Sequence, residues 1–264
     1  MEIIEAIILG IIQGFTEWLP LSSEAMTSLI MINFFGFSLK NAIYYAIWLH
    51  TGTLLSAMIY FRKDLFNILR NIPNCFKKQD ESIKICKLTK FIMVSTTLTA
   101  LIGIPIMMLG FDKLELSGKV ATLMIGIFLI ITGLLQLTRS KGAILSKEMR
   151  LTDAAPVGFL QGFSILPGIS RSGITVSSLL LMGYDAKKAI RISFLMSIPV
   201  ILIAEIGITL LSKIKFDINS IIAILTSLFF GLITIRLLII AASRINFGYF
   251  CIFIGLLSSF AFFV

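Results

Sequence analysis

Charge is scarce in this sequence. Lys, Arg, Asp and Glu make up only 14% of the 264 residues, whereas hydrophobic residues make up 57%. The mean hydropathy is +0.99. Soluble domains carry about 25% charged residues, so this composition excludes a soluble globular fold. The apolar runs reach the roughly 20 residues that a helix needs to cross a bilayer, and the sequence therefore predicts a polytopic membrane protein.

Other common features are also missing. The first residues lack the basic stretch and the cleavage site of a signal peptide, so we expect the first apolar segment to stay in the mature protein. The three cysteines, Cys75, Cys86 and Cys251, show no zinc-binding spacing. We expect free thiols, because the first two lie in a segment assigned to the reducing cytoplasm. No basic stripe is interleaved with aromatic residues, so the net charge of +9 does not indicate nucleic-acid binding.

The positive charges cluster between apolar runs. They fall mainly in four segments: 62–90, 138–150, 183–191 and 242–245. Cytoplasmic connections of membrane proteins carry an excess of Lys and Arg, so we assign these segments to the cytoplasm and both chain ends to the outside. The predicted full spans are 42–61, 91–110, 119–137, 191–211, 219–241 and 246–264.

Two further apolar segments, 3–36 and 152–182, are interrupted by Gly, Pro and Ser and share a motif. The first reads Gln13-Gly14-Phe15-Thr16-Glu17-Trp18-Leu19-Pro20, and the second reads Gln161-Gly162-Phe163-Ser164-Ile165-Leu166-Pro167. The charge pattern makes each segment enter and leave by one face. We therefore predict an all-α fold with a single membrane domain, 1–264. It is built as an inverted repeat (about 1–140 and 150–264), and each half is a re-entrant broken hairpin followed by three spans.

Arg171 is the one basic residue inside a hydrophobic hairpin. A guanidinium at that depth is costly and usually functional. Its surroundings, Gly168 to Thr175, suit an oxyanion: glycines allow close approach, hydroxyls donate hydrogen bonds, and the following half-helix presents free N–H groups. The planar guanidinium matches phosphate oxygens. The alternative is that Arg171 pairs only with Glu17 and joins the two hairpins.

The first hairpin supplies a carboxylate. Glu17 follows Gln13 by four residues, so both project from one helical face. The helix is expected to break at Pro20, before Ser22 and Ser23. A carboxylate beside a phosphate site can bind a divalent cation or accept a proton from a nucleophile. Glu24 either has a direct role or lies at the mouth of the hairpin.

Together these motifs, with Leu181-Met182-Gly183 after them, resemble the undecaprenyl-diphosphatase (bacitracin-resistance) family along the whole chain. The resemblance implies a phosphatase of the plasma membrane that converts undecaprenyl diphosphate to the monophosphate carrier of cell-wall glycans. It also implies a divalent cation, Mg²⁺ or Ca²⁺, and a site open to the outer face. Carried over by position, the catalytic residues are Glu17, Ser23 and Arg171, with Glu17 also a metal ligand. The substrate-binding residues are Gln13, Ser22, Gly168, Ser170, Ser172 and Thr175.

Two positions depart from the family pattern. Gln13 stands where the pattern allows Glu or Gln, and Ser22-Ser23-Glu24-Ala25-Met26 stands where the family usually has Ser-Ser-Thr-Gly-His. Methionine cannot transfer a proton. The only histidine, His50, is either a catalytic substitute or bonded to a neighbouring helix for structural reasons. Two other functions remain as alternatives: a polyprenyl-phosphate transporter or flippase, and a non-catalytic binder of lipid phosphates. The sequence assigns no role to Glu205 and does not decide whether the protein forms a homodimer.

Overall fold

The computed structural model describes residues 2–19, 21–76, 84–110, 118–137, 148–166, 168–211, 217–241 and 248–260. Within these ranges the chain forms helices and no strand. They are α1 (Ile3–Thr16), α2 (Ser23–Asn33), α3 (Leu39–Tyr60), α4 (Arg62–Cys75), α5 (Lys84–Gly110), α6 (Gly118–Leu137), η1 (Leu151–Asp153), α7 (Ala154–Gly162), η2 (Phe163–Ile165), α8 (Arg171–Leu181), α9 (Ala186–Leu211), α10 (Ile218–Ala241) and α11 (Gly248–Phe260).

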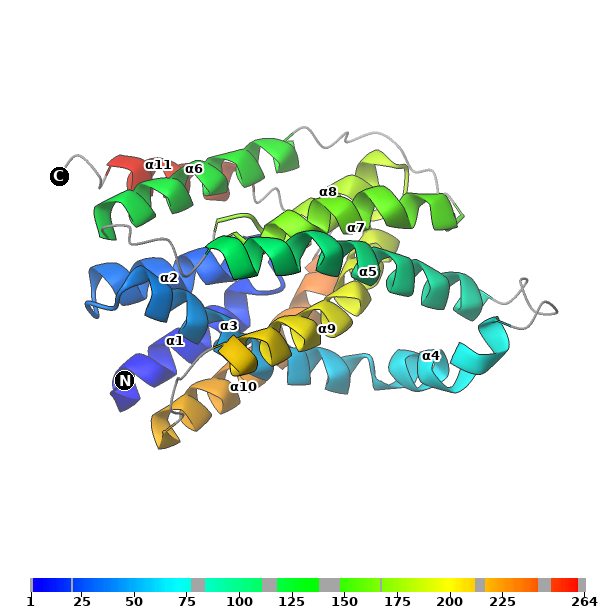
Figure 1. Ribbon diagram of the computed structural model, residues 1–264, viewed down its shortest axis with the longest axis horizontal. Coiled ribbons are helices and arrows are strands. Elements are labelled where there is room, and N and C mark those ends of the chain that lie inside the picture. The colour runs from blue at the N-terminus through cyan, green and yellow to red at the C-terminus, as the bar shows by residue number, and fades with distance from the viewer. Residues whose placement is uncertain are drawn as a thin grey trace.

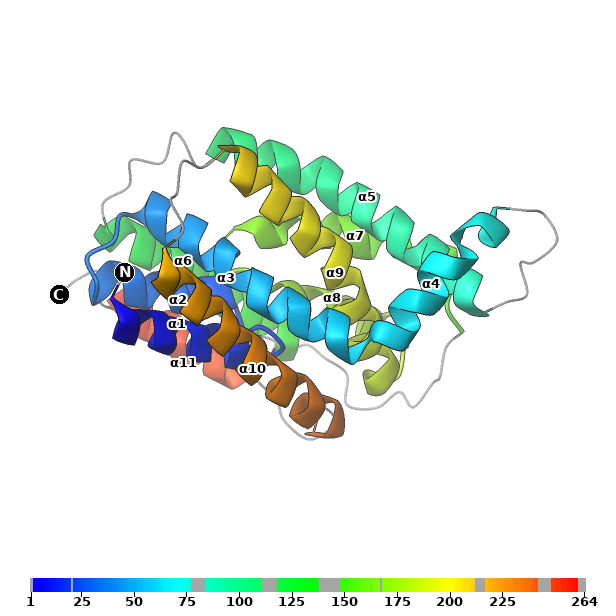
Figure 2. The ribbon, with the colours of Figure 1, turned by 90° about the horizontal axis from the view of Figure 1, so that it is seen from below.

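Four of these helices, α3, α5, α9 and α10, are long and apolar enough to cross a membrane. The chain is therefore an all-α polytopic membrane protein, as predicted. The predicted span 119–137 coincides with α6, and α11 occupies part of the predicted span 246–264; residues 246–247 and 261–264 lie outside the described residues. The start of α1 and the helix α4 lie at opposite ends of the molecule (Figures 1 and 2). The predicted topology requires this separation.

Both predicted hairpins are broken helices. In the first, α1 ends at Thr16, and Ser22 caps α2 by accepting a hydrogen bond from the Ala25 N–H. In the second, α7 and the 3₁₀ turn η2 precede α8, which Ser170 caps by accepting from the Gly173 N–H. Serine at this position satisfies an N–H that the helix itself cannot pair. Pro20 and Pro167, the predicted breaks, lie outside the described residues.

The first helix of each hairpin packs against the other half of the chain. Helix α1 lies on α10, and α7 lies on α5. Glycines allow the close approach: a Cβ at Gly10 would lie 2.5 Å from the Ala223 carbonyl oxygen, and one at Gly158 would lie 2.4 Å from that of Ser95. Each of these contacts joins the two halves of the sequence. The internal repeat, and the inversion of one half relative to the membrane, stay predictions.

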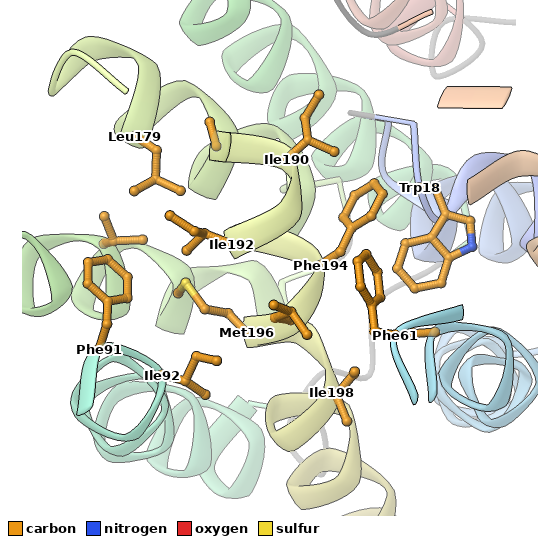
Figure 3. Close-up of a cluster of buried hydrophobic side chains, with 14 of the residues drawn as sticks. Trp18, Phe61, Phe91, Ile92, Leu179, Ile190, Ile192, Phe194, Met196 and Ile198 are labelled. Atoms are coloured by element: carbon orange, nitrogen blue, oxygen red, sulfur yellow. The ribbon is translucent and has the colours of Figure 1, made fainter. Parts of the chain in front are cut away.

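The largest cluster of buried apolar side chains surrounds α9. Phe194 lies between two other aromatic rings, with centroid distances of 4.8 Å to Trp18 and 6.5 Å to Phe61 (Figure 3). Trp18 follows Glu17 directly in the sequence and is almost fully buried. Packing of the indole against Phe194 therefore fixes the break of the first hairpin in place.

Two of the predicted basic connections are partly helical. Most of the segment 62–90 forms α4 and the start of α5. The basic residues of 187–191 lie on the first turns of α9, because Asp185 accepts a hydrogen bond from the Lys188 N–H at 2.9 Å and so starts the helix there. The segments 138–147 and 242–245 lie outside the described residues.

The prediction of free thiols is wrong for two of the three cysteines. Cys75 and Cys86 form a disulfide, with their Cα atoms 5.1 Å apart. The two residues come together because α4 turns back onto α5, a contact between helices that sequence spacing does not reveal. The side chain of Cys251 lies outside the described residues.

Candidate functional site

The carboxylate of Glu17 lies at the centre of the two hairpins and is buried, with 4% of the residue exposed. Its Oε2 accepts hydrogen bonds from Ser23 Oγ at 2.6 Å and from Gln13 Nε2 at 3.0 Å. The same oxygen lies 2.9 Å from His50 Nε2. Its other oxygen, Oε1, accepts a hydrogen bond from Arg171 Nη2. One carboxylate thus gathers side chains from α1, α2, α3 and α8.

His50 reaches this site from the middle of α3. Its Nδ1 lies 2.7 Å from the Ala46 carbonyl oxygen, and its Nε2 faces Glu17 and lies 3.4 Å from Ser23 Oγ. The Ala46 carbonyl only accepts hydrogen bonds, so Nδ1 carries a hydrogen and Nε2 is the nitrogen that faces the site. Ser23 thus lies close to His50.

Hydrogen bonds across the breaks tie the two hairpins together. They are Gly168 N–H to Ser22 Oγ (3.1 Å), Ser170 Oγ to the Leu21 carbonyl (3.1 Å) and Ser172 Oγ to the Leu19 carbonyl (2.9 Å). Gly168 has φ +103°, which only glycine adopts without strain. The serine that caps each half-helix therefore also bonds the opposite hairpin. This places the N-termini of α2 and α8 at a common point.

A cavity of about 390 Å³ opens at this point. At its polar end it is lined by Glu17, Ser22, Ser23, Glu24, His50, Ser170, Arg171 and Ser172. It continues between α5 and α9 along apolar side chains, including Ile104, Met108 and Ile206. These three side chains are partly exposed, and the helices that carry them, α5 and α9, run side by side (Figure 2). The cavity thus suits a molecule with an anionic head and an apolar tail.

Comparison with known proteins gives a consistent result. The family model of the bacitracin resistance protein BacA matches residues 6–260. An undecaprenyl-diphosphatase of Methanococcoides burtonii is 48% identical over 98% of this chain and 97% of its own length. Proteins of the same name from Methanothrix thermoacetophila and Haloarcula marismortui are 36% and 35% identical, covering 98% and 96% of this chain and 96% and 94% of their own lengths.

The chain belongs to the BacA family. Three of the predicted substrate-binding residues, Gln13, Gly168 and Thr175, do not line the cavity. Gln13 holds Glu17, and Gly168 shapes the second break. Thr175 bonds the Arg171 carbonyl at 2.8 Å and Ser193 Oγ at 2.6 Å. These three residues support the site from outside the cavity.

Sequence reasoning missed part of the cavity wall. Thr96 and Thr99 of α5 and Gln161 of α7 also line it. Gln161 Nε2 donates a hydrogen bond to Thr99 Oγ1 at 2.9 Å. A signal was available, because Gln161 begins the second of the two similar motifs, at the position that Gln13 has in the first. Ile165 stands where the first half has Glu17, so this amide faces a threonine instead of a carboxylate.

The carboxylates of the cavity can be tested against the divalent cation that the BacA resemblance implies. In the described part of the chain, no three His, Cys, Asp or Glu side chains come together as a metal cluster. Glu17 and Glu24 both line the cavity. Mg²⁺ is commonly held by one or two carboxylates together with substrate phosphates. The residues therefore fit a cation shared with a bound diphosphate.

Glu205 lies outside this site. It accepts a hydrogen bond from Thr51 Oγ1 at 3.0 Å and faces a second cavity of about 300 Å³ between α3 and α9, which Trp48 also lines. The bond joins two membrane-spanning helices.

Proposed function

We propose that this chain is a membrane phosphatase that hydrolyses a polyprenyl diphosphate, undecaprenyl diphosphate by the name of its relatives, to the monophosphate carrier lipid and phosphate. The observation that carries the proposal is the contact of Ser23 Oγ with Glu17 Oε2 at 2.6 Å beside Arg171. A hydroxyl, a base and an anion-binding guanidinium meet at the polar end of a cavity whose other end is apolar.

The chemistry follows from these contacts. Glu17 Oε2 takes the proton of Ser23, and Ser23 Oγ attacks the terminal phosphorus, so that the bond to the lipid monophosphate breaks. Arg171 and the N-terminus of α8 hold the phosphoryl oxygens where negative charge develops. Water then attacks the phosphorus, the bond from phosphorus to Ser23 Oγ breaks, and Glu17 returns the proton to Ser23 Oγ, while both hydrogens of the water leave with the phosphate. When bound, a divalent cation held by Glu17 and Glu24 would neutralise charge on the diphosphate.

The apolar half of the cavity would take the start of the prenyl chain. Ile104 and Met108 lie near the end of α5, and Ile206 lies near the end of α9. The charge pattern assigns both helix ends to the outer side of the plasma membrane. The lipid would therefore enter sideways between α5 and α9 from the outer leaflet, with its diphosphate turned toward Arg171.

Purified protein should release phosphate from C55 and C15 prenyl diphosphates, and a chelator should abolish the release. Ser23→Ala and Glu17→Gln should each remove turnover, whereas Arg191→Gln, on the exposed surface, should not. Binding of prenyl phosphates without any phosphate release under any metal condition would refute the proposal. It would favour a transporter or a binding protein.

A further inference from the structure

Glu205 is a carboxylate inside a membrane-spanning helix, and the proposed phosphatase chemistry does not use it. Its Oε1 accepts a hydrogen bond from Thr51 Oγ1 at 3.0 Å. Its Oε2 is buried and has no hydrogen-bond partner among the described residues. Within the same ranges, no Lys, Arg or His forms an ion pair with Glu205. A carboxylate inside a bilayer is costly unless it is paired, so Oε2 needs a partner from outside the described chain.

The hydroxyls beside Glu205 have no hydrogen left to donate. A hydroxyl carries one hydrogen. Thr51 gives its hydrogen to Glu205 Oε1, and Thr209 gives its hydrogen to the Glu205 backbone carbonyl at 2.8 Å. All three residues line one cavity, so together they offer a bound molecule acceptor oxygens. A phosphate would find no donor at these three groups, whereas a group with several N–H hydrogens would match them.

The rest of this cavity is apolar and aromatic. It has a volume of about 300 Å³, lies between α3 and α9, and is also lined by Trp48, Leu54, Leu202 and Ile206. The face of an indole ring attracts cations, and the aliphatic side chains suit a hydrocarbon. Leu202 and Ile206 are 40% and 60% exposed and lie on α9, which is apolar enough to cross a membrane. A molecule dissolved in the bilayer can therefore reach the cavity from the side.

We propose that this cavity binds an amphiphilic amine, with its ammonium group on Glu205 and its hydrocarbon chain along Leu54 and Leu202. The ammonium supplies both the positive charge and the hydrogens that the acceptor oxygens lack. Among the described residues, Ile206 alone lines both this cavity and the diphosphate cavity. The two cavities also differ in charge, because Arg171 recognises an anion and Glu205 a cation. The proposed amine site does not depend on the proposed phosphatase function.

The chain carries its own reporter of binding at this cavity. It has two tryptophans. Trp48 lines the cavity, whereas Trp18 packs against Phe194 in the core and is 1% exposed. The full-length protein in a non-ionic maltoside detergent can be titrated with dodecylamine brominated at mid-chain, because bromine quenches tryptophan fluorescence on contact. We expect saturable quenching that is absent from Trp48→Phe.

The matched probe is the dodecanol with the same brominated chain. It has the same apolar body but no charge, so half-maximal quenching should need a concentration about 10–10²-fold higher, the usual value of a hydrogen bond to a charged group. Glu205→Gln should weaken binding of the amine by a similar factor and leave binding of the alcohol unchanged. The amide keeps the size of Glu205 and the acceptor for Thr51. Glu148→Gln removes a carboxylate from an exposed position and should bind the amine like the wild type.

A second variant tests the cavity without changing its charge. Leu202→Phe enlarges a side chain of the cavity wall that is partly exposed. The larger ring should fill part of the cavity and weaken binding of both the amine and the alcohol. This variant decides the test if Glu205→Gln does not fold, because unchanged amine binding by Leu202→Phe overturns the proposal.

Three other results would also overturn it. Equal binding of the amine and the alcohol would show an apolar cavity without a cation site. Wild-type affinity of Glu205→Gln for the amine would show that the carboxylate does not hold it. Undiminished quenching in Trp48→Phe would place the amine elsewhere on the protein. None of these measurements involves phosphate release, so the amine site and the phosphatase function succeed or fail separately.

Discussion

Arg171 Nη2 donates a hydrogen bond to Glu17 Oε1, joining the first residue of α8 to the end of α1 across 154 positions of sequence. Both side chains are largely buried. A buried charge without a partner costs several kcal/mol. The Arg171–Glu17 ion pair therefore offsets the cost of burying each of the two charges. The same pair also lines the cavity, where a bound phosphate would compete with Glu17 for the guanidinium.

Arg171→Lys should reduce phosphate release strongly. An ammonium can replace the charge but cannot bind two oxygens at once as the planar guanidinium does. We expect a loss of about 10²–10³-fold in kcat, the usual scale for a contact that stabilises developing charge. Arg191→Lys is the matched control, because Arg191 pairs with Asp64 on the exposed surface and should keep wild-type kinetics. A loss below tenfold for Arg171→Lys would contradict the assigned role.

Ser22→Ala should lower the thermal stability of the protein in detergent. The Ser22 hydroxyl accepts hydrogen bonds from the N–H groups of Ala25 and Gly168, and alanine would leave both without that acceptor. The cost should be about 1–2 kcal/mol. Ser28→Ala is the control, since the buried Ser28 hydroxyl has no hydrogen-bond partner among the described residues. Equal melting temperatures for the two variants would show that the tie between the hairpins contributes little.

Gly158→Val should disturb the packing of α7 on α5. A Cβ at this position would lie 2.4 Å from the Ser95 carbonyl oxygen, so the helices must separate. Overpacking of this kind costs about 1–3 kcal/mol. At Gly103 the nearest atom to a new Cβ would be 3.4 Å away, and Gly103→Ala should fold normally. Size-exclusion profiles and melting temperatures of both variants check this prediction, which fails if Gly158→Val matches the wild type.

The disulfide predicts a thiol count. Protein purified without reductant and then denatured should react with one equivalent of thiol reagent, and with three after reduction, because Cys75 and Cys86 are paired. Reduction should also lower stability by about 2–4 kcal/mol. Three reactive thiols before reduction would show that the pair is absent in the purified protein.

Tyr184, in the turn between α8 and α9, should make stability depend on pH. Burial raises the pKa of Tyr184 to about 12, and the hydrogen bond to Asp153 acts in the same direction. The folded state thus holds the phenol proton more tightly than the unfolded state does. The stabilisation is complete below pH 10, the ordinary pKa of tyrosine, and is lost as pH rises toward about 12. Unfolding curves of Tyr184→Phe should decline less steeply over this interval than those of the wild type; parallel curves would contradict the assignment.

Most of the hairpin architecture could be predicted from the sequence, because it rests on local signals. The motifs at Gln13–Glu17 and Gly168–Thr175 mark the breaks, and Arg171 needs a buried partner of opposite charge. The meeting of Arg171 with Glu17 is confirmed. The position of His50 could not be predicted, because helical periodicity shows which face a residue occupies but not which helix that face will meet. The disulfide between Cys75 and Cys86 escaped prediction for the same reason, since it depends on how α4 folds back.

The bonds that tie the two hairpins also set when the site can exist during synthesis. Ser22 and Glu17 enter the membrane early, but Gly168 and Arg171 are translated about 150 residues later. When only the first half of the chain has been translated, the Glu17 carboxylate is present but its partner, the Arg171 guanidinium, has not yet been synthesised. The site therefore needs both halves of the chain, because a product that ends before α8 would lack Arg171 and Ser172, which line the cavity.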